Sequence, residues 1–141
     1  MNLVTSIIGF RSNNKDYSDH SSIDKNLSLN GKCSKNADVF YYINDGIFGS
    51  FANIIYEKAV YHVDCLRTKS KESSHSPITL LNSAVFGPTC DSSDCLSSSV
   101  DLPLMQIGDY LLFYNVGAYS SSASMNFNGF NTKKYFYIWK T

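Results

Sequence analysis

Several features that define large classes of proteins are missing from this sequence. Its 141 residues include 12 basic and 12 acidic side chains, so the formal net charge is zero, and no run of like charge resembles a nucleic-acid-binding arm. The longest apolar stretches are far too short to cross a membrane. The N-terminus lacks the cationic and apolar regions of a secretory signal peptide. We therefore expect neither nucleic acid nor membrane as a partner.

Cysteine and histidine are few, and their spacing suits neither cross-links nor metal. Cys33, Cys65, Cys90 and Cys95 include no C-x-x-C pair, and a disulfide scaffold is usually smaller and richer in cysteine. The three histidines show neither the H-E-x-x-H pattern nor H-x₃₋₅-H spacing, so we predict no metal site. This pattern predicts reduced thiols in a cytoplasmic protein.

Helical periodicity is weak, and the apolar runs have the length of β-strands. Residues 2–10 form a β-branched run, and residues 133–140 alternate rings and aliphatic side chains as a half-buried closing strand would. Aromatic residues make up 14% of the chain, which suits packing against a sheet. The best helical candidate is a short segment within 50–59, with Ser50 as its N-cap.

Turn dipeptides divide the rest of the chain. Asp45-Gly46 lies within the strand-like segment 39–51 and predicts a hairpin. Gly108-Asp109 opens the segment 107–119, which we expect to continue as a strand buried on both faces.

Two polar segments interrupt these apolar runs. Residues 11–38 and 67–77 are rich in small polar and charged side chains, and they cannot bury enough apolar surface to offset the entropy cost of ordering. We predict that both are mobile surface loops. With no internal repeat and the length of one domain, the chain is expected to form a single β-domain over residues 1–141, with its main unit at 39–141.

The stretch FGPTCDSSD places Cys90 beside Asp91 directly after a Gly-Pro turn, with Asp94 three residues on. A thiol can transfer a proton near neutral pH, and a fixed carboxylate can bind an ammonium group through a charge-assisted hydrogen bond. The polar surroundings favour such a functional pair. The alternative is a packed, inert thiol beside ordinary turn acids.

Four motifs occur in fixed order: FYYINDGIFGSF (40–51), FGPTCDSSD (86–94), LPLMQIGDYLLFYNVGAY (102–119) and FNGF (127–130). Together they resemble the C-terminal β-domain of eukaryotic-type ornithine decarboxylases, pyridoxal-phosphate enzymes of the alanine-racemase fold. The resemblance implies a mainly β, Greek-key-like barrel or sandwich, without the (β/α)₈ barrel that family members also contain.

The resemblance also implies roles for individual residues. The cysteine matching Cys90 reaches into the partner subunit's site and helps control protonation at the carbon that loses CO₂. The acid matching Asp91 binds the distal ammonium of ornithine, and the tyrosine matching Tyr119 hydrogen-bonds the cofactor phosphate. Without the resemblance, Tyr119 would be read as a core aromatic residue. The residues matching Phe127 and Asn128 line the site.

Other matched positions concern the substrate and the dimer. The acid matching Asp94 makes a salt bridge between subunits. Tyr56-Glu57 stands where the family has Tyr-Asp, and Phe48 replaces a family tyrosine; all three residues are expected to contact substrate. The longer arm of Glu57 is expected to shift the preferred substrate length, and Phe48 lacks the hydroxyl of the family tyrosine. The other reading of Glu57 is a solvated charge on an exposed turn.

The chemistry of such enzymes depends on parts that this sequence lacks. In the family, pyridoxal phosphate is held by a Schiff-base lysine and a Gly-rich loop on a barrel of roughly 250 residues. We find neither a lysine in a matching context nor such a loop, so we expect this chain alone to bind no cofactor and to catalyse no decarboxylation. Its expected partners are a barrel domain and a second subunit of a homodimer. Without them, a sheet edge and an apolar face should be exposed.

Three functions are compatible with these residues. The first is the C-terminal part of an ornithine decarboxylase, which converts L-ornithine to putrescine and CO₂ in polyamine biosynthesis and can be controlled by an antizyme-type regulator. The second is a non-catalytic paralogue like the antizyme inhibitors, against which the presence of Cys90, Asp91 and Tyr119 argues. The third is a decarboxylase of lysine, arginine or diaminopimelate, an option that Glu57 leaves open.

Overall fold

The computed structural model of the protein describes residues 2–13, 37–66 and 79–130. The closing strand expected at 133–140 lies outside these residues, as do nearly all of the two polar loops expected at 11–38 and 67–77. In the described ranges no helix is both long and apolar enough to cross a bilayer.

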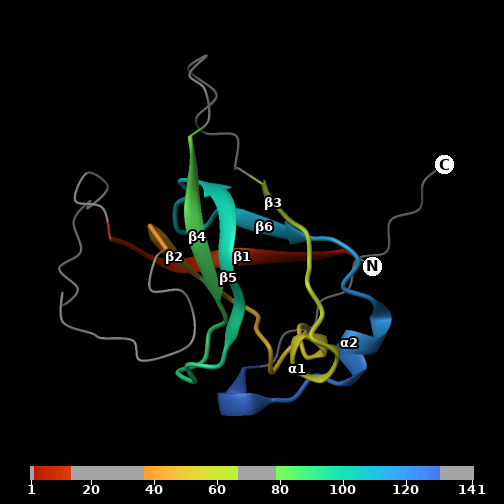
Figure 1. The fold of residues 1–141 in the computed structure, drawn as a ribbon. Helices are drawn as coiled ribbons and strands as arrows, with labels where there is room; N and C mark the ends of the chain where they lie inside the picture. The colour runs from red at the N-terminus through yellow and green to blue at the C-terminus, as the bar shows by residue number, and fades with distance from the viewer. Residues whose placement is uncertain (1, 14–36, 67–78, 131–141) are drawn as a thin grey trace.

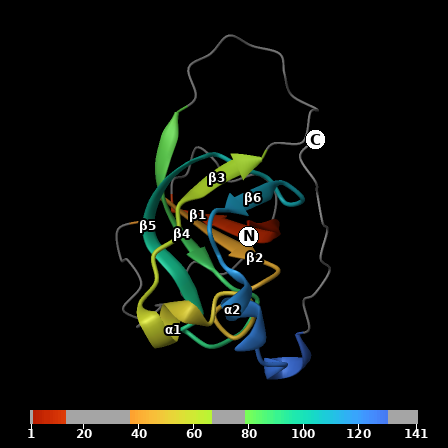
Figure 2. The same ribbon diagram turned by 90° about the vertical axis from the view of Figure 1, so that its right-hand side faces the viewer.

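The described residues form a mainly β structure with one curled sheet (Figures 1 and 2). Its six strands lie in the order β3-β6-β1-β2-β4-β5, and only the β2–β4 pair is parallel. The curl brings the two edge strands, β3 and β5, near each other. The strand bounds are β1 Leu3–Ser12, β2 Val39–Ile43, β3 Val63–Leu66, β4 Leu80–Phe86, β5 Cys95–Pro103 and β6 Tyr110–Phe113.

Strand β1 joins the two halves of this sheet. Its first part pairs with β6 through Leu3–Ser6, and its second part pairs with β2. The register with β2 shifts between Ile7 and Gly9, and such an irregularity bends a strand and increases its twist. The bend lets one long strand follow the curve of a half-barrel.

The main core lies inside the curl, where the inward side chains of the strands meet. Tyr41 of β2 is fully buried here, and its hydroxyl donates to the Pro103 carbonyl at 3.1 Å while accepting the Met105 N–H at 3.0 Å. A second, smaller cluster of Ala37, Phe40, Ala84 and Phe86 covers the opposite face of β2 and β4. The two parallel strands are therefore apolar on both faces, as is usual for parallel pairs.

Three short helices lie at one end of the sheet, close to the β4–β5 connection (Figures 1 and 2). They are α1 (Asn53–Glu57), α2 (Ala118–Ser122) and the 3₁₀ turn η3 (Phe127–Gly129). The candidate functional residues are carried by these helices and by the loops beside them.

Several sequence predictions are confirmed. The expected strand at 2–10 is β1, and the expected short helix within 50–59 is α1. A turn precedes β6, with Gly108 at a φ of 94°, a conformation that favours glycine.

Other predictions are wrong. Asp45-Gly46 forms no hairpin: the Asp45 carboxylate accepts the N–H groups of Gly46 at 2.8 Å and Ser50 at 3.0 Å, and this bends the chain from β2 into α1. Ser50 is not the N-cap, which is Ala52 without a side-chain bond. Strand β6 alternates exposed Tyr110 with buried Leu111, so it is not buried on both faces.

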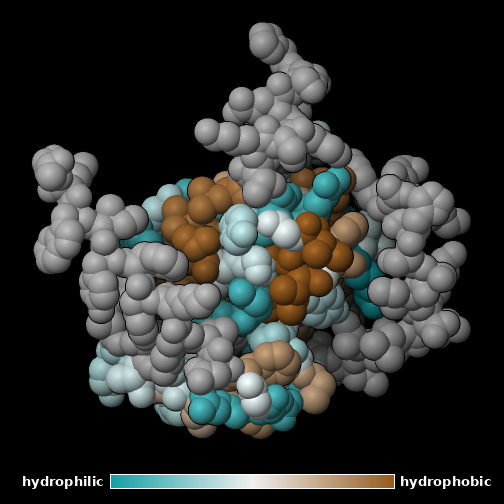
Figure 3. Space-filling model, turned by 180° about the vertical axis from the view of Figure 1, so that it is seen from behind, coloured by the Kyte–Doolittle hydropathy of each residue, from teal (hydrophilic) through white to brown (hydrophobic). Residues whose placement is uncertain are grey.

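The predicted exposure of apolar side chains is present in the described part of the chain. The outer positions of β1, β3 and β6 are at least two-fifths exposed at Val4, Ile8, Leu66 and Tyr110. Seen from behind, the surface carries apolar patches among polar side chains (Figure 3). Patches of this kind are typical of surfaces that are covered by another protein unit.

Candidate functional site

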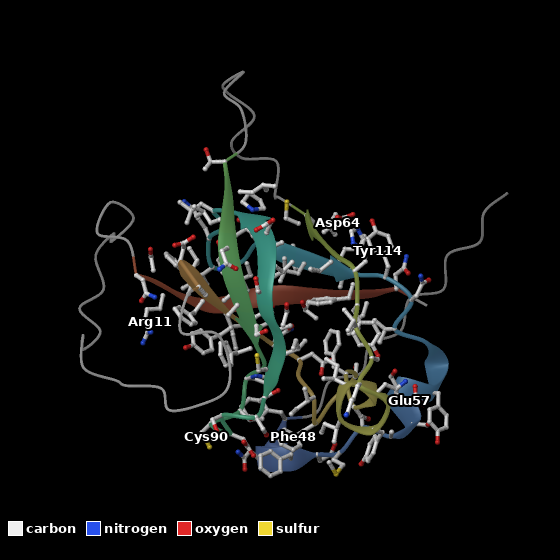
Figure 4. The ribbon with its side chains drawn as sticks, in the orientation of Figure 1. Arg11, Phe48, Glu57, Asp64, Cys90 and Tyr114 are labelled. Atoms are coloured by element: carbon white, nitrogen blue, oxygen red, sulfur yellow. The ribbon has the colours of Figure 1, made fainter. Side chains whose placement is uncertain are left out.

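The candidate site begins at the tip of the β4–β5 connection. Phe86 and Cys95 are paired across the two antiparallel strands, and the Gly87 N–H donates to the Asp94 carbonyl at 2.9 Å, which closes the loop. Cys90 is a free, exposed thiol on this loop. It lies at the same end of the molecule as Phe48 and Glu57, away from Asp64 and Tyr114 (Figure 4). The bend therefore turns Cys90 outward, where another surface can reach it.

Asp91, the next residue, is also exposed, and Ser93 holds its carboxylate. The Ser93 N–H and hydroxyl both donate to Oδ1 at 2.8 Å. The backbone hydrogen bond, followed by that of the hydroxyl, lowers the pKa of Asp91 below its usual value. The carboxylate is thus fixed and ionised at neutral pH, as binding of an ammonium group requires.

The segment that follows α2 contacts the Cys90 thiol. Asn128 has a left-handed backbone, with a φ of 53°, and its side-chain amide donates to Cys90 Sγ at 3.7 Å. The preceding Phe127 stacks on Phe48 with ring centroids 4.2 Å apart. The structure thus brings together four of the predicted site residues, from three segments distant in the sequence.

Asp94 lies behind the loop rather than at its surface. It is only 1% exposed, and its carboxylate accepts hydrogen bonds from the Ile47 N–H at 2.9 Å and from Thr89. Both of its oxygens are therefore engaged within the chain. A salt bridge from Asp94 to a second subunit stays a prediction.

A small pocket lies between these segments. Its lining includes Phe48, Thr89, Asp94, Phe127 and Phe130. Because Thr89 directly precedes the exposed Cys90, this end of the molecule can present apolar and thiol groups to one ligand or surface.

Three further predicted residues lie on α1 and α2, at the same end of the molecule. Tyr56 and Glu57 are exposed on α1, and Tyr119 is 71% exposed on α2. Because Tyr119 is exposed, the alternative that it is a core aromatic residue is wrong. The substrate and cofactor roles of these three residues stay predictions.

The oxidation state of the cysteines differs from the prediction that all are reduced. Cys65 and Cys90 are free, but Cys95 is disulfide-bonded. Its partner lies outside the described residues. The prediction was wrong because C-x-x-C spacing reports only local pairs, whereas a strand residue can be bonded to a distant segment.

A family model described as the pyridoxal-dependent decarboxylase C-terminal sheet domain matches residues 1–117. This chain belongs to the pyridoxal-dependent decarboxylase family. The match includes the β4–β5 loop with Cys90 and Asp91, and it ends before Tyr119 and Asn128. The mainly β fold predicted from the motifs is that of this decarboxylase domain.

Two curated relatives are similar over most of the chain. Antizyme inhibitor 2 of Xenopus laevis is 39% identical over 108 residues, covering 77% of this chain and 23% of that protein. Ornithine decarboxylase of Rattus norvegicus is 40% identical over 108 residues, covering 74% of this chain and 22% of that protein. The chain thus spans less than a quarter of the length of either relative.

A solved structure supports the same assignment. The lysine/ornithine decarboxylase of Vibrio vulnificus, solved with cadaverine, superposes with a TM-score of 0.65 at 25% identity, over 92% of this chain and 28% of that chain. The decarboxylase sheet domain therefore accounts for nearly the whole of this chain.

The described residues do not by themselves fit pyridoxal phosphate. Their single lysine, Lys58, is exposed, follows α1 in a left-handed conformation and does not line the pocket described above. An aldehyde cofactor bound through a lysine needs that amine inside a shaped pocket. The predicted cofactor-binding residue, Tyr119, is an exposed side chain rather than part of an enclosed site.

Sequence reasoning missed Asp45 and the internal role of Asp94 as residues that build this site. Each is buried and binds backbone N–H groups of the turn at 44–51. A usable signal was present, because Gly46, Gly49 and Gly87 all leave room for one of the two carboxylates.

Proposed function

We propose that this chain is the C-terminal part of an ornithine decarboxylase that converts L-ornithine to putrescine and CO₂. The observation that carries the proposal is the β4–β5 loop, which presents Cys90 and Asp91 together on the surface, next to Asn128. Groups exposed in this way serve chemistry at a site built with another surface. Membership of a pyridoxal-dependent decarboxylase family supports that site being a decarboxylase centre.

In this proposal each side chain has one task. Asp91 binds the distal ammonium of the substrate through its fixed, ionised carboxylate, and so selects a diamino acid. Cys90 holds or delivers a proton at the carbon that loses CO₂. The wall of the site is formed by Phe48, Phe127 and Asn128. The far end of the substrate is contacted by Tyr56 and Glu57. Tyr119 binds the cofactor phosphate. The pyridoxal cofactor, when bound in the complete enzyme, supplies the electron sink for loss of CO₂.

The proposed partners are a (β/α)₈ barrel domain that carries the cofactor and a second subunit in a homodimer. Exposed apolar positions on β1, β3 and β6 support coverage by such units. We place the protein in the cytoplasm and in polyamine biosynthesis, with an antizyme-type protein as a regulator.

Two observations keep other functions in view. Antizyme inhibitor 2 is as similar as ornithine decarboxylase, which favours a non-catalytic role as the second candidate. The Vibrio vulnificus enzyme is named for both lysine and ornithine, and Glu57 puts a longer acidic arm where the family has aspartate, so a longer substrate is the third.

One experiment separates these three functions. The barrel of the rat ornithine decarboxylase is fused to this chain in place of its own sheet domain, and CO₂ release from ornithine, lysine and arginine is measured. We expect turnover with ornithine as the preferred substrate. Preference for lysine or arginine would support the third function. A folded, cofactor-loaded dimer without turnover of any substrate would contradict a decarboxylase and favour the antizyme-inhibitor role.

A further inference from the structure

The buried carboxylate of Asp94 connects two loops that are distant in the sequence. Oδ1 accepts the Ile47 N–H at 2.9 Å, and Oδ2 accepts the Thr89 N–H at 3.1 Å and the Thr89 hydroxyl at 2.7 Å. The Cys90–Asp91 bend is thus tied to the turn at 44–51 through a single side chain.

Two glycines make room for this connection. A Cβ atom at Gly46 or at Gly87 would collide with the Asp94 carboxylate. Neither glycine has a positive φ, so the backbone of both would accept another residue. Glycine is needed at these positions for space, which indicates that the site is built around the carboxylate.

The same turn also holds the segment that contacts the thiol. The Phe48 carbonyl accepts the Met125 N–H at 2.7 Å, and the Phe48 ring stacks on Phe127. The adjacent Asn128 then donates to Cys90 Sγ at 3.7 Å. The turn at 44–51 is therefore the common support of Cys90 on one side and of Asn128 on the other.

We propose that Asp94 is a positioning residue: its buried carboxylate fixes the Cys90–Asp91 bend against the turn at 44–51 and so sets the thiol opposite Asn128. This role is internal to one chain and needs no second subunit. Its consequence for catalysis rests on the proposed function, but the geometry itself can be tested without any turnover.

The first test is amide hydrogen exchange in this chain, resolved by residue with NMR. In Asp94→Asn, one carboxylate oxygen becomes an NH₂ group that faces a backbone N–H. Exchange at the amide that faces the NH₂ group, either Ile47 or Thr89, should rise roughly tenfold or more, because that amide loses its partner and opens locally. Asp101→Asn removes a carboxylate from an exposed position of β5 and should leave both rates unchanged. Wild-type rates at both amides in Asp94→Asn would overturn the proposal.

A second measurement separates positioning from a general loss of stability. The side-chain amide resonances of Asn128 report its contact with the sulfur, and they should move in Asp94→Asn as they do in Cys90→Ala. Tyr41→Phe removes core hydrogen bonds to Pro103 and Met105, which belong to neither loop of the site, and should leave those resonances in place. Resonances that move equally in Tyr41→Phe and Asp94→Asn would show a merely structural role.

Gly87→Ala, which keeps Asp94, covers the case in which Asp94→Asn fails to fold, and a double-mutant cycle then tests the coupling. Gly87→Ala alone should raise exchange at Ile47, because its methyl group displaces the carboxylate. In an Asp94→Ala background the added methyl has room, so Gly87→Ala should add less than a twofold change. Strictly additive effects would refute the coupling. An inactive barrel fusion would leave all of these results untouched, and so would refute only the proposed function.

Discussion

Individual side chains at the two ends of the molecule differ in how they depend on pH. At the site, Ser93 lowers the pKa of Asp91. The hydrogen bonds of Asp91 therefore stabilise the folded state fully when the pH is above 3.8, the ordinary pKa of this side chain. This stabilisation is lost as the pH falls through the lower pKa of the folded state. Between pH 5 and 9 the carboxylate should stay charged, as recognition of an ammonium requires.

At the opposite end, Tyr114 donates its hydroxyl to Asp64 at 2.8 Å, and this hydrogen bond, followed by desolvation and the charge of Asp64, raises the pKa of Tyr114 above 10.0. A raised folded-state pKa stabilises the protein fully below pH 10.0, and this stabilisation is lost as the pH rises through the folded-state value. We predict that Asp64→Asn moves the Tyr114 titration back toward its ordinary value.

The measurement is the ultraviolet absorbance of tyrosinate, taken as the difference between each protein and its Tyr114→Phe variant. Asp101→Asn is the charge-matched control, since this acid lies on another strand. An unchanged Tyr114 titration in Asp64→Asn would contradict the assignment of the hydrogen bond as the main cause.

At the scale of elements, the sequence predicted what depends on local pattern. The β-branched run of β1 and the turn before β6 are encoded in neighbouring residues. Strand β5 was missed, because its serine-rich sequence lacks an apolar run and its strand form depends on pairing with β4. Asp45-Gly46 was misread because the same dipeptide can also bind a following turn through the Asp45 carboxylate.

The site shows the same division. The exposure of Cys90 and Asp91 could be predicted from one short motif, because it follows from a local bend. The burial of Asp94 could not be predicted from that motif, because one of its partners, Ile47, is 47 residues away in the sequence. Residues that present groups to solvent are thus easier to find than those that hold the presenting loops.

The hydrogen bonds of the Tyr41 hydroxyl, which join β2 to residues 103–105, allow a further prediction at this scale. Tyr41→Phe removes a buried hydroxyl and leaves the Pro103 carbonyl and the Met105 N–H without it. Unsatisfied buried groups cost about 1–3 kcal/mol, so we expect the free energy of unfolding to fall by about 2 kcal/mol. Urea denaturation measures this change.

Tyr42→Phe is the matched control. This ring is half-buried against Phe86, and no hydrogen bond of its hydroxyl is present among the described residues. Its loss should change stability by less than about 0.5 kcal/mol, as is usual away from such features. Equal losses for the two variants would show that the Tyr41 hydroxyl makes no special contribution.

At the scale of the whole molecule, the described residues supply one part of the proposed shared site. The described residues contain the groups of a rim and one exposed lysine, Lys58, but no cavity around an amine. We predict that the 141-residue chain binds pyridoxal phosphate without saturation and without an absorbance band from a cofactor held in a site. Titration followed by absorbance checks this prediction, with the barrel fusion as the positive control. A saturable band in the isolated chain would contradict it.

The central claim is that Cys90 lends its thiol to decarboxylation on another protein surface. The most direct measurement is the turnover of ornithine by the barrel fusion, with Cys90→Ala compared with Cys65→Ala, a free thiol on β3. We predict that Cys90→Ala lowers turnover on the order of 100-fold, as removal of a proton-transfer group does, while cofactor absorbance is retained. Cys65→Ala should keep turnover within about twofold, as expected away from the site. Wild-type turnover in Cys90→Ala would contradict the claim.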